Sequence, residues 1–188
     1  HLKVQKSKND KRDGKFVLST TAPSNGDHVF PELETASSYS RIYDNEKWNF
    51  AVRLRPSKNH GGLVTGSFEP ISSAYVLELY GVNYLSNILQ EEFVLSSSIS
   101  FETAIKFFER PKRIFAGARR NNFTGSVATH SDVKVASVRY WHDYLTNDTI
   151  KAHALDSFTY GAGNPYKNDN FFSKFSHKSI PQIEKLVM

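Results

Sequence analysis

The sequence predicts an all-β protein in which two antiparallel sheets pack as a sandwich, with one short helix near residues 146–155. Aromatic residues make up 13% of the 188 residues, mainly 14 Phe and 9 Tyr, and such residues are enriched in strands. Several segments alternate apolar and polar residues with a period of two. They follow one another at short spacing with little helical pattern between them, which favours antiparallel sheets over alternating strands and helices.

The first half of the chain holds the clearest strand patterns. Phe16 to Leu18 fits a short first strand, and residues 19–40, with Pro23, Pro31 and many serines, fit a loop. Two longer strands are predicted at 75–82 and 92–98. Between 48 and 54 the alternation is regular up to Pro56, and one face carries Trp48, Phe50, Val52 and Leu54.

The second half is predicted to form the closing strands and the helix. Residues 104–109 fit either a helical turn or a strand. An apolar strand at 113–118 is followed by a polar turn at 119–125, a looser loop at 126–131 and a long strand at 132–141. Thr146 or Asn147 can then cap a helix that carries Ile150, Ala154 and Leu155 at helical spacing. The expected core comprises Trp48, Phe50, Val52, Leu54, Ile114, Val135 and Trp141.

Charge is unevenly distributed along the chain. The net charge is +5, and residues 1–15 supply +4 of it through six Lys or Arg against two Asp. We therefore predict a basic arm or linker at 1–14, a sandwich domain at 15–160 and an irregular extension at 161–188 that leads into a further domain. A basic tail on a nearly neutral domain disfavours nucleic acid as the partner. No run is long and apolar enough to span a membrane.

Other features of composition bear on the origin of the chain. Cysteine is absent, which excludes disulfides and thiolate metal sites. The chain begins with His1, and its only Met is Met188. We therefore expect it to be a fragment of a longer polypeptide or a processed product.

Five sequence motifs follow one another in an order that is typical of a known domain type. They are WNFAVR at 48–53, YVLELYG at 75–81, AGA at 116–118, NFTG at 122–125 and a run from Ser131 to Trp141 that ends in VRYW. Together they resemble laminin-G-like domains of the concanavalin-A-like superfamily over residues 40–160, which implies a jelly-roll sandwich. Continued to Tyr160-Gly161, the pattern also resembles modules of large structural proteins in phages and other viruses. This second resemblance implies a virion or extracellular location and other subunits of the assembly as partners.

Catalytic patterns are weak. Glucanases of the same superfamily place paired carboxylates on one strand, because glycoside hydrolysis needs two of them across the sugar. Here Glu78 has no acidic partner two or four residues away, and the adjacent Glu91 and Glu92 point to opposite faces of a strand. We expect these carboxylates to be solvated on sheet faces. The seven histidines form no HxH or HExxH pair, so we expect no enzymatic activity.

Calcium is the one cofactor to consider, because laminin-G-like and lectin domains often bind it through Asp, Asn and backbone oxygens. Asn122 and Asp132 border the loop between the last two predicted strands, with Asn121 beside them. That loop supplies one carboxylate where calcium wants six or more oxygens. The alternative is turn chemistry, in which Asn and Asp bond to their own backbone.

A sugar site would combine an exposed aromatic ring with polar groups that fix its orientation. Two clusters meet this description: Tyr43 with Asp44 and Asn45, and Phe123 with Asn121 and Asn122. Loop aromatics more often pin a loop to the core. We therefore expect a non-enzymatic structural or attachment module of a large assembly, with a carbohydrate-binding adhesion module as the alternative.

Overall fold

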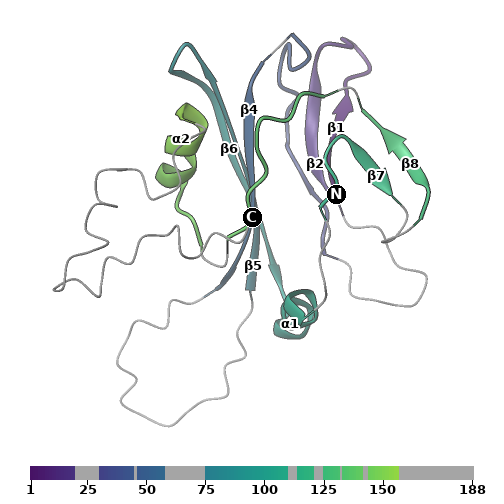
Figure 1. Cartoon of the computed structure of the whole chain (residues 1–188), viewed down its shortest axis with the longest axis vertical. Helices are drawn as coiled ribbons and strands as arrows, with labels where there is room; N and C mark the ends of the chain where they lie inside the picture. Colours follow the sequence, from purple (N-terminus) through teal and green to yellow (C-terminus); the bar gives the residue numbers. More distant parts are fainter. Residues whose placement is uncertain are drawn as a thin grey trace, which may run out of the picture. The chain divides into compact units, whose positions relative to one another are not determined.

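The chain forms mostly β structure. In the computed structural model, the described residues are 1–19, 30–44, 46–57, 75–109, 114–120, 125–131, 133–141 and 144–156, and they form three antiparallel sheets and two short helices (Figure 1). The chain divides into two compact units, His1–Arg110 and Pro111–Met188. This division falls inside the range 15–160 that the sequence suggested for a single domain.

The first sheet contains β1 (Leu2–Lys6), β2 (Gly14–Leu18) and β3 (Leu33–Glu34) in that order. All five residues of β1 pair with β2, from Leu2 opposite Leu18 to Lys6 opposite Gly14. Within the segment 1–14, which was predicted to be a basic arm or linker, Leu2–Lys6 is therefore a strand of this sheet. The sequence signal was weak because Lys3, Gln5 and Lys6 give β1 a polar composition, while Leu2 and Val4 supply the apolar face.

The second sheet contains β4 (Trp48–Pro56), β5 (Tyr75–Leu85) and β6 (Ile88–Ile99), again in chain order. The strands predicted at 48–54, 75–82 and 92–98 are confirmed, although β5 and β6 extend further towards each other than expected. Trp48 lies opposite Asn83 in the register, and Glu78 lies opposite Arg53. The β5–β6 register shifts at Asn83/Tyr84, where a bulge precedes the turn.

The two sheets share a core that is dense in aromatic rings. Phe16 of β2 lies 4.6 Å from Trp48, 4.9 Å from Phe50 and 5.5 Å from Phe93, measured between ring centroids. Phe93 lies opposite Gly81 in the register, and a Cβ built at Gly81 would come within 2.4 Å of the Phe93 ring. Glycine at this position therefore makes room for an aromatic side chain. The buried members of the core are Phe16, Leu18, Leu33, Leu77, Leu79, Phe93, Ile99 and Ala104.

Part of the predicted core is wrong. Trp48, Phe50 and Leu54 pack against the core as expected, but Val52 is 53% exposed. Val52 lies between Phe50 and Leu54 on the same face of β4, so alternation assigned its face but did not show that it is exposed. In the second unit, Ile114 and Val135 are exposed and Trp141 is half-buried.

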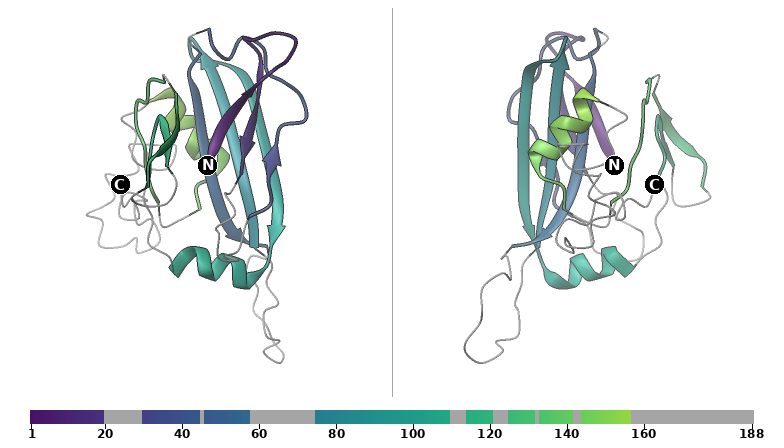
Figure 2. Two further views of the ribbon diagram at one scale, coloured as in Figure 1. Left: turned by 90° about the vertical axis from the view of Figure 1, so that its right-hand side faces the viewer. Right: turned by 60° about the vertical axis from the view of Figure 1, so that its left-hand side comes forward.

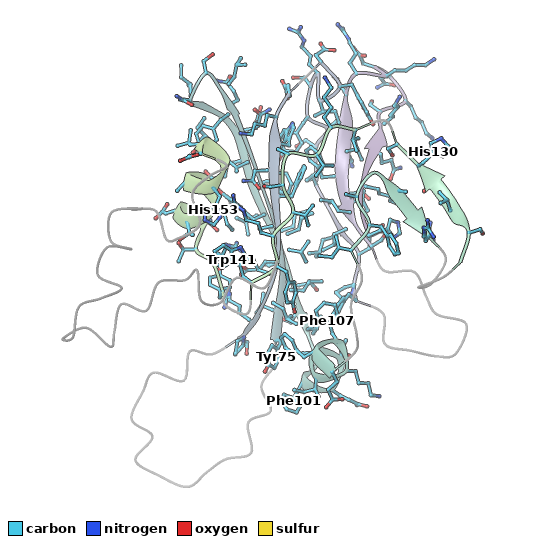
Figure 3. The ribbon with its side chains drawn as sticks, viewed as in Figure 1. Tyr75, Phe101, Phe107, His130, Trp141 and His153 are labelled. Carbon is cyan, nitrogen blue, oxygen red and sulfur yellow. The ribbon has the colours of Figure 1, made fainter. Side chains whose placement is uncertain are left out.

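The ambiguous segment around 104–109 is helix α1 (Phe101–Glu109). Its start is capped by Ser100, whose Oγ accepts a hydrogen bond from the Thr103 backbone N–H at 3.2 Å. Ala104 is fully buried, and the ring centroids of Tyr75 and Phe101 lie 6.1 Å apart (Figure 3). The helix therefore covers the end of the core at which β5 begins.

The second unit contains β7 (Ala118–Arg120), β8 (Val127–His130) and α2 (Asn147–Leu155). The helix and its Thr146 cap are confirmed, because Thr146 Oγ1 accepts a hydrogen bond from the Thr149 backbone N–H at 3.3 Å. The β predictions are wrong here: residues 114–117 are not a strand, and β7 and β8 form where a turn and a loop were expected. Residues 133–140 form no strand either. Their β propensity is not sufficient, because a strand also needs a neighbouring strand, and no strand of the described residues pairs with this segment.

Strand order bears on the finer topology. Within the described residues each strand pairs only with its neighbour in sequence. A jelly roll is built from Greek keys, in which a long connection brings a strand back beside an earlier one. That topology therefore stays a prediction. Neither of the two described helices is long and apolar enough to cross a membrane.

Candidate functional site

The β1–β2 turn and the β5–β6 turn lie at the same end of the first unit (Figure 1 and Figure 2). We call it the turn end, and it comprises the β1–β2 turn (residues 7–13), the segment 39–44, residues 46–47 and the β5–β6 turn with its flanks (residues 84–92). Backbone hydrogen bonds join Gly14 and Tyr39 in both directions, at 3.1 and 2.9 Å. The Tyr39 ring in turn lies 5.3 Å from the ring of Trp48, the first residue of β4, measured between centroids. These contacts fix the two sheets to each other at this end.

The β1–β2 turn is basic. Backbone bonds from Ser7 N to Asp13 O (2.8 Å) and from Asp13 N to Asp10 O (3.1 Å) shape it. The Arg12 guanidinium bonds to the Asp10 carboxylate at 3.1 Å, and this hydrogen bond lowers the pKa of Asp10. Lys8 and Lys11 are exposed, so the turn presents its positive charge to solvent.

The segment that carries Tyr43 and Asp44 is tied to this turn. Arg41 has a positive φ of 58°, its backbone N–H donates to Asp13 Oδ1 at 3.0 Å, and its Nε lies 2.8 Å from Asp44 Oδ2. Tyr43 is 46% exposed, and the Lys6 ammonium lies 4.7 Å above its ring centroid. The two predicted ligand-binding residues therefore lie together, but each already contacts a cation of the same chain.

The other predicted ligand residues lie outside the described residues. These are Asn45, Asn121, Asn122, Phe123 and Asp132. The second sugar cluster and the calcium site at Asn122 and Asp132 therefore stay predictions. Among the residues that are described, no group of three or more His, Asp or Glu side chains is placed to hold a metal ion.

The tip of the β5–β6 hairpin is the feature that sequence reasoning missed. Ser86 and Asn87 have positive φ values of 51° and 64°, the signature of a type I′ turn. The flanking Leu85 and Ile88 are 64% and 65% exposed, and Leu89 is 41% exposed. The signal was present in the sequence as Leu85-Ser-Asn-Ile88, a turn pair between apolar residues.

A polar anchor holds the base of this hairpin. Glu46 Oε2 accepts hydrogen bonds from Asn83 Nδ2 at 2.7 Å and from Trp48 Nε1 at 3.2 Å. Asn83 is buried, so this bond satisfies an amide that would otherwise be costly to desolvate. The hairpin therefore rises from a fixed base, and its apolar tip is presented to solvent at a defined position.

A buried charge cluster lies on the face of the second sheet opposite the core. The Glu78 carboxylate lies 3.0 Å from Arg53 Nη2 and 2.9 Å from Arg55 Nε. Glu78 and Arg53 are 4% and 6% exposed, so the prediction that Glu78 is solvated is wrong. Period-two alternation placed both residues on this face correctly, but it did not show that the face is buried. Both carboxylate oxygens of Glu78 are therefore engaged by arginines of the same sheet.

Tyr80 extends the same cluster. Its hydroxyl donates to Glu92 Oε1 at 3.0 Å, and the Arg53 guanidinium lies 5.2 Å from its ring centroid. Burial, followed by the hydrogen bond to Glu92, raises the pKa of Tyr80 well above its ordinary value. The cluster pairs two arginines with two glutamates and therefore carries no net charge.

In the second unit, His153 and His130 differ in burial. His153 of α2 is buried, and its ring stacks on Trp141 with centroids 5.6 Å apart and an interplanar angle of 18° (Figure 3). His130 is exposed on β8. The buried stack gives His153 a packing role within this unit.

No protein-family model, curated protein or solved structure matches this chain.

Proposed function

We propose that this chain is a non-enzymatic structural or attachment module, held in a large assembly by protein contacts at its turn end. The observation that carries the proposal is the pair Leu85 and Ile88, which stand 64% and 65% exposed at the tip of an anchored hairpin. Single exposed apolar side chains are common on protein surfaces, whereas large apolar side chains that are exposed next to one another often mark an interaction surface. A rigid hairpin also loses little conformational entropy when it binds.

The wider part of the proposal is supported by the resemblance of the strand motifs to laminin-G-like modules. On that basis the domain is a jelly-roll sandwich, and the assembly is a phage or virus particle. The lack of an enzymatic role is supported by the chemistry of Glu78, whose carboxylate is bonded to Arg53 and Arg55.

Footprinting tests the carrying observation. Hydroxyl radicals modify exposed Leu and Ile side chains, so Leu85 and Ile88 should react in the isolated chain and be protected in the native particle. Val127 is 47% exposed on β8 and serves as the internal reference. Equal reactivity of Leu85 and Ile88 in the two samples would contradict the proposal.

The alternative is a carbohydrate-binding adhesion module, favoured by one observation, the 46% exposure of Tyr43 beside Asp44. The Lys6 ammonium over its ring works against sugar stacking, because a sugar would have to displace it. A glycan array with and without calcium separates the two functions. We expect no binding, whereas binding that is lost in both Tyr43→Ala and Phe123→Ala would make adhesion the primary function.

A further inference from the structure

The hairpin tip is apolar on both of its faces. Leu85 lies opposite Ile88, and Tyr84 lies opposite Leu89. Because successive side chains of a strand point to opposite faces, these two pairs lie on opposite sides of the ribbon. A hairpin that docked flat on a partner would need one apolar face only. The tip is therefore suited to end-on contact with a surface that packs against both sides of it.

The charges around the tip select the kind of surface. Residues 46–47 and 84–92 carry Glu46, Glu91 and Glu92 against Lys47, a net charge of −2. Across the same end of the unit, the β1–β2 turn carries Lys8, Lys11 and Arg12 against Asp10 and Asp13, a net charge of +1. The two sides of the turn end therefore have net charges of opposite sign. The acidic side repels an anionic lipid surface and attracts a basic one.

The basic side also offers apolar contact. Val4 and Ile42 both lie close to Gly14, since a Cβ built there would meet their side chains at 3.0 and 2.8 Å. Val4 is 39% exposed, and Tyr43, which follows Ile42, is 46% exposed. This apolar ledge, formed by Val4, Ile42 and Tyr43, lies beside the basic turn. The ledge and the tip are therefore complementary, because both are apolar and the charges around them have opposite signs.

We infer that the turn end pairs with the turn end of a second copy of this chain about a two-fold axis, the tip of each copy resting on the ledge of the other. The inference rests on the proposed function and names the partner. A two-fold axis brings each acidic tip against a basic turn and uses both complementary contacts at once. The contact area is small, so the dissociation constant should be on the order of 10 μM.

Sedimentation velocity tests the pairing from about 1 μM to about 100 μM of the full chain. We expect a monomer–dimer equilibrium that weakens between about 0.05 M and about 0.5 M salt. The double variant Leu85→Ser/Ile88→Ser should weaken association by at least about tenfold. Its matched control is Val94→Ser, an exposed apolar residue of β6 away from the tip, which should dimerise like the wild type. All of these side chains are exposed, and circular dichroism verifies that each variant is folded.

Charge exchange tests the two-fold arrangement itself. Glu91→Lys and Lys11→Glu should each weaken self-association by about threefold to tenfold. An equimolar mixture of the two variants should recover the wild-type affinity, because each interface then joins opposite charges at both contacts. Failure of the mixture to recover, a monomer at every concentration, or growth beyond the dimer would each overturn the inference.

Vesicle flotation distinguishes a lipid surface from a second copy of the chain as the partner of the tip. Wild-type chain should not float with vesicles of phosphatidylcholine, alone or with phosphatidylserine. A monomer whose binding to such vesicles is lost in Leu85→Ser/Ile88→Ser would replace the second copy with a lipid surface. If the chain stays monomeric while Leu85 and Ile88 are still protected in the particle, the inference fails and the proposed function stands.

Discussion

At the scale of single residues, the ion pairs of this protein differ widely in what they contribute. The Glu78–Arg53 pair has side chains that are 6% and 5% exposed, whereas in the Lys15–Glu34 pair both are at least one-third exposed. Water screens the second pair, and it hardly reaches the first. A buried pair adds little relative to apolar residues of the same size, but breaking one leaves a charge desolvated.

Substitution of Glu78 should therefore have a large effect. Glu78→Gln removes the counter-charge of two arginines, and we expect the free energy of unfolding to fall by about 3–5 kcal/mol. The matched control Glu34→Gln should change it by less than about 1 kcal/mol. Urea denaturation measures both, and equal effects would show that the Glu78 cluster is accessible to solvent.

Tyr80 should make the stability depend on alkaline pH. Its pKa is raised in the folded state, first by burial and then by the hydrogen bond to Glu92. A tyrosine with a raised pKa holds its proton more tightly when folded. Its contribution is thus fully present below its unfolded pKa, near 10.0, and is lost as the pH rises above that value. Tyr80→Phe should reduce this alkaline loss in denaturation curves measured on both sides of that pH. An unchanged pH profile would mean that other groups cause the loss.

At the scale of elements, the sequence predicted best what depends on local pattern. The strands β4, β5 and β6 have regular alternation, and α2 has its capping threonine, so their existence followed from the residues themselves. The segment 133–141 has the same β-rich composition as β5 but is not a strand, because a partner strand is a property of the whole fold. Alternation also assigned residues to the correct face of a strand without showing whether that face is buried. Val52 lies on the core face and is exposed, whereas Arg53 lies on the opposite face and is buried.

The candidate site follows the same rule. Tyr43 and Asp44 were placed correctly in a loop before β4. Their partners Lys6 and Arg41 could not be predicted, because β1 had no clear strand signal and the Arg41 turn depends on Asp13, 28 residues away. The apolar hairpin tip could have been found, since an Asn between short apolar runs is a recognised turn signal.

The β5–β6 turn itself can be tested. Both Ser86 and Asn87 adopt positive φ, which glycine accepts without steric cost. Asn87→Gly should therefore stabilise the protein or leave it unchanged, within about 1 kcal/mol, whereas Asn87→Val should destabilise it by about 1–2 kcal/mol. Thermal denaturation of both variants gives the order, and a stable Asn87→Val protein would argue against the type I′ turn.

At the scale of the whole molecule, the core belongs to one unit. Every buried member of the hydrophobic cluster lies between Phe16 and Ala104. A fragment comprising His1–Arg110 should therefore fold by itself and unfold cooperatively. Calorimetry and near-ultraviolet circular dichroism of the fragment test this expectation. A fragment without a cooperative transition would show that the two units depend on each other to fold.

The order of strands in the two larger sheets has a consequence for how the chain reaches its native state. Because β1 to β3 and β4 to β6 each pair in sequence order, the strand pairings within each of these sheets join consecutive strands. Closing the loops between consecutive strands costs less chain entropy than pairing strands that are distant in sequence. The second sheet is also complete once Ile99 has been made. During synthesis, this unit can thus acquire its structure from the N-terminus onward before the ribosome has finished the chain.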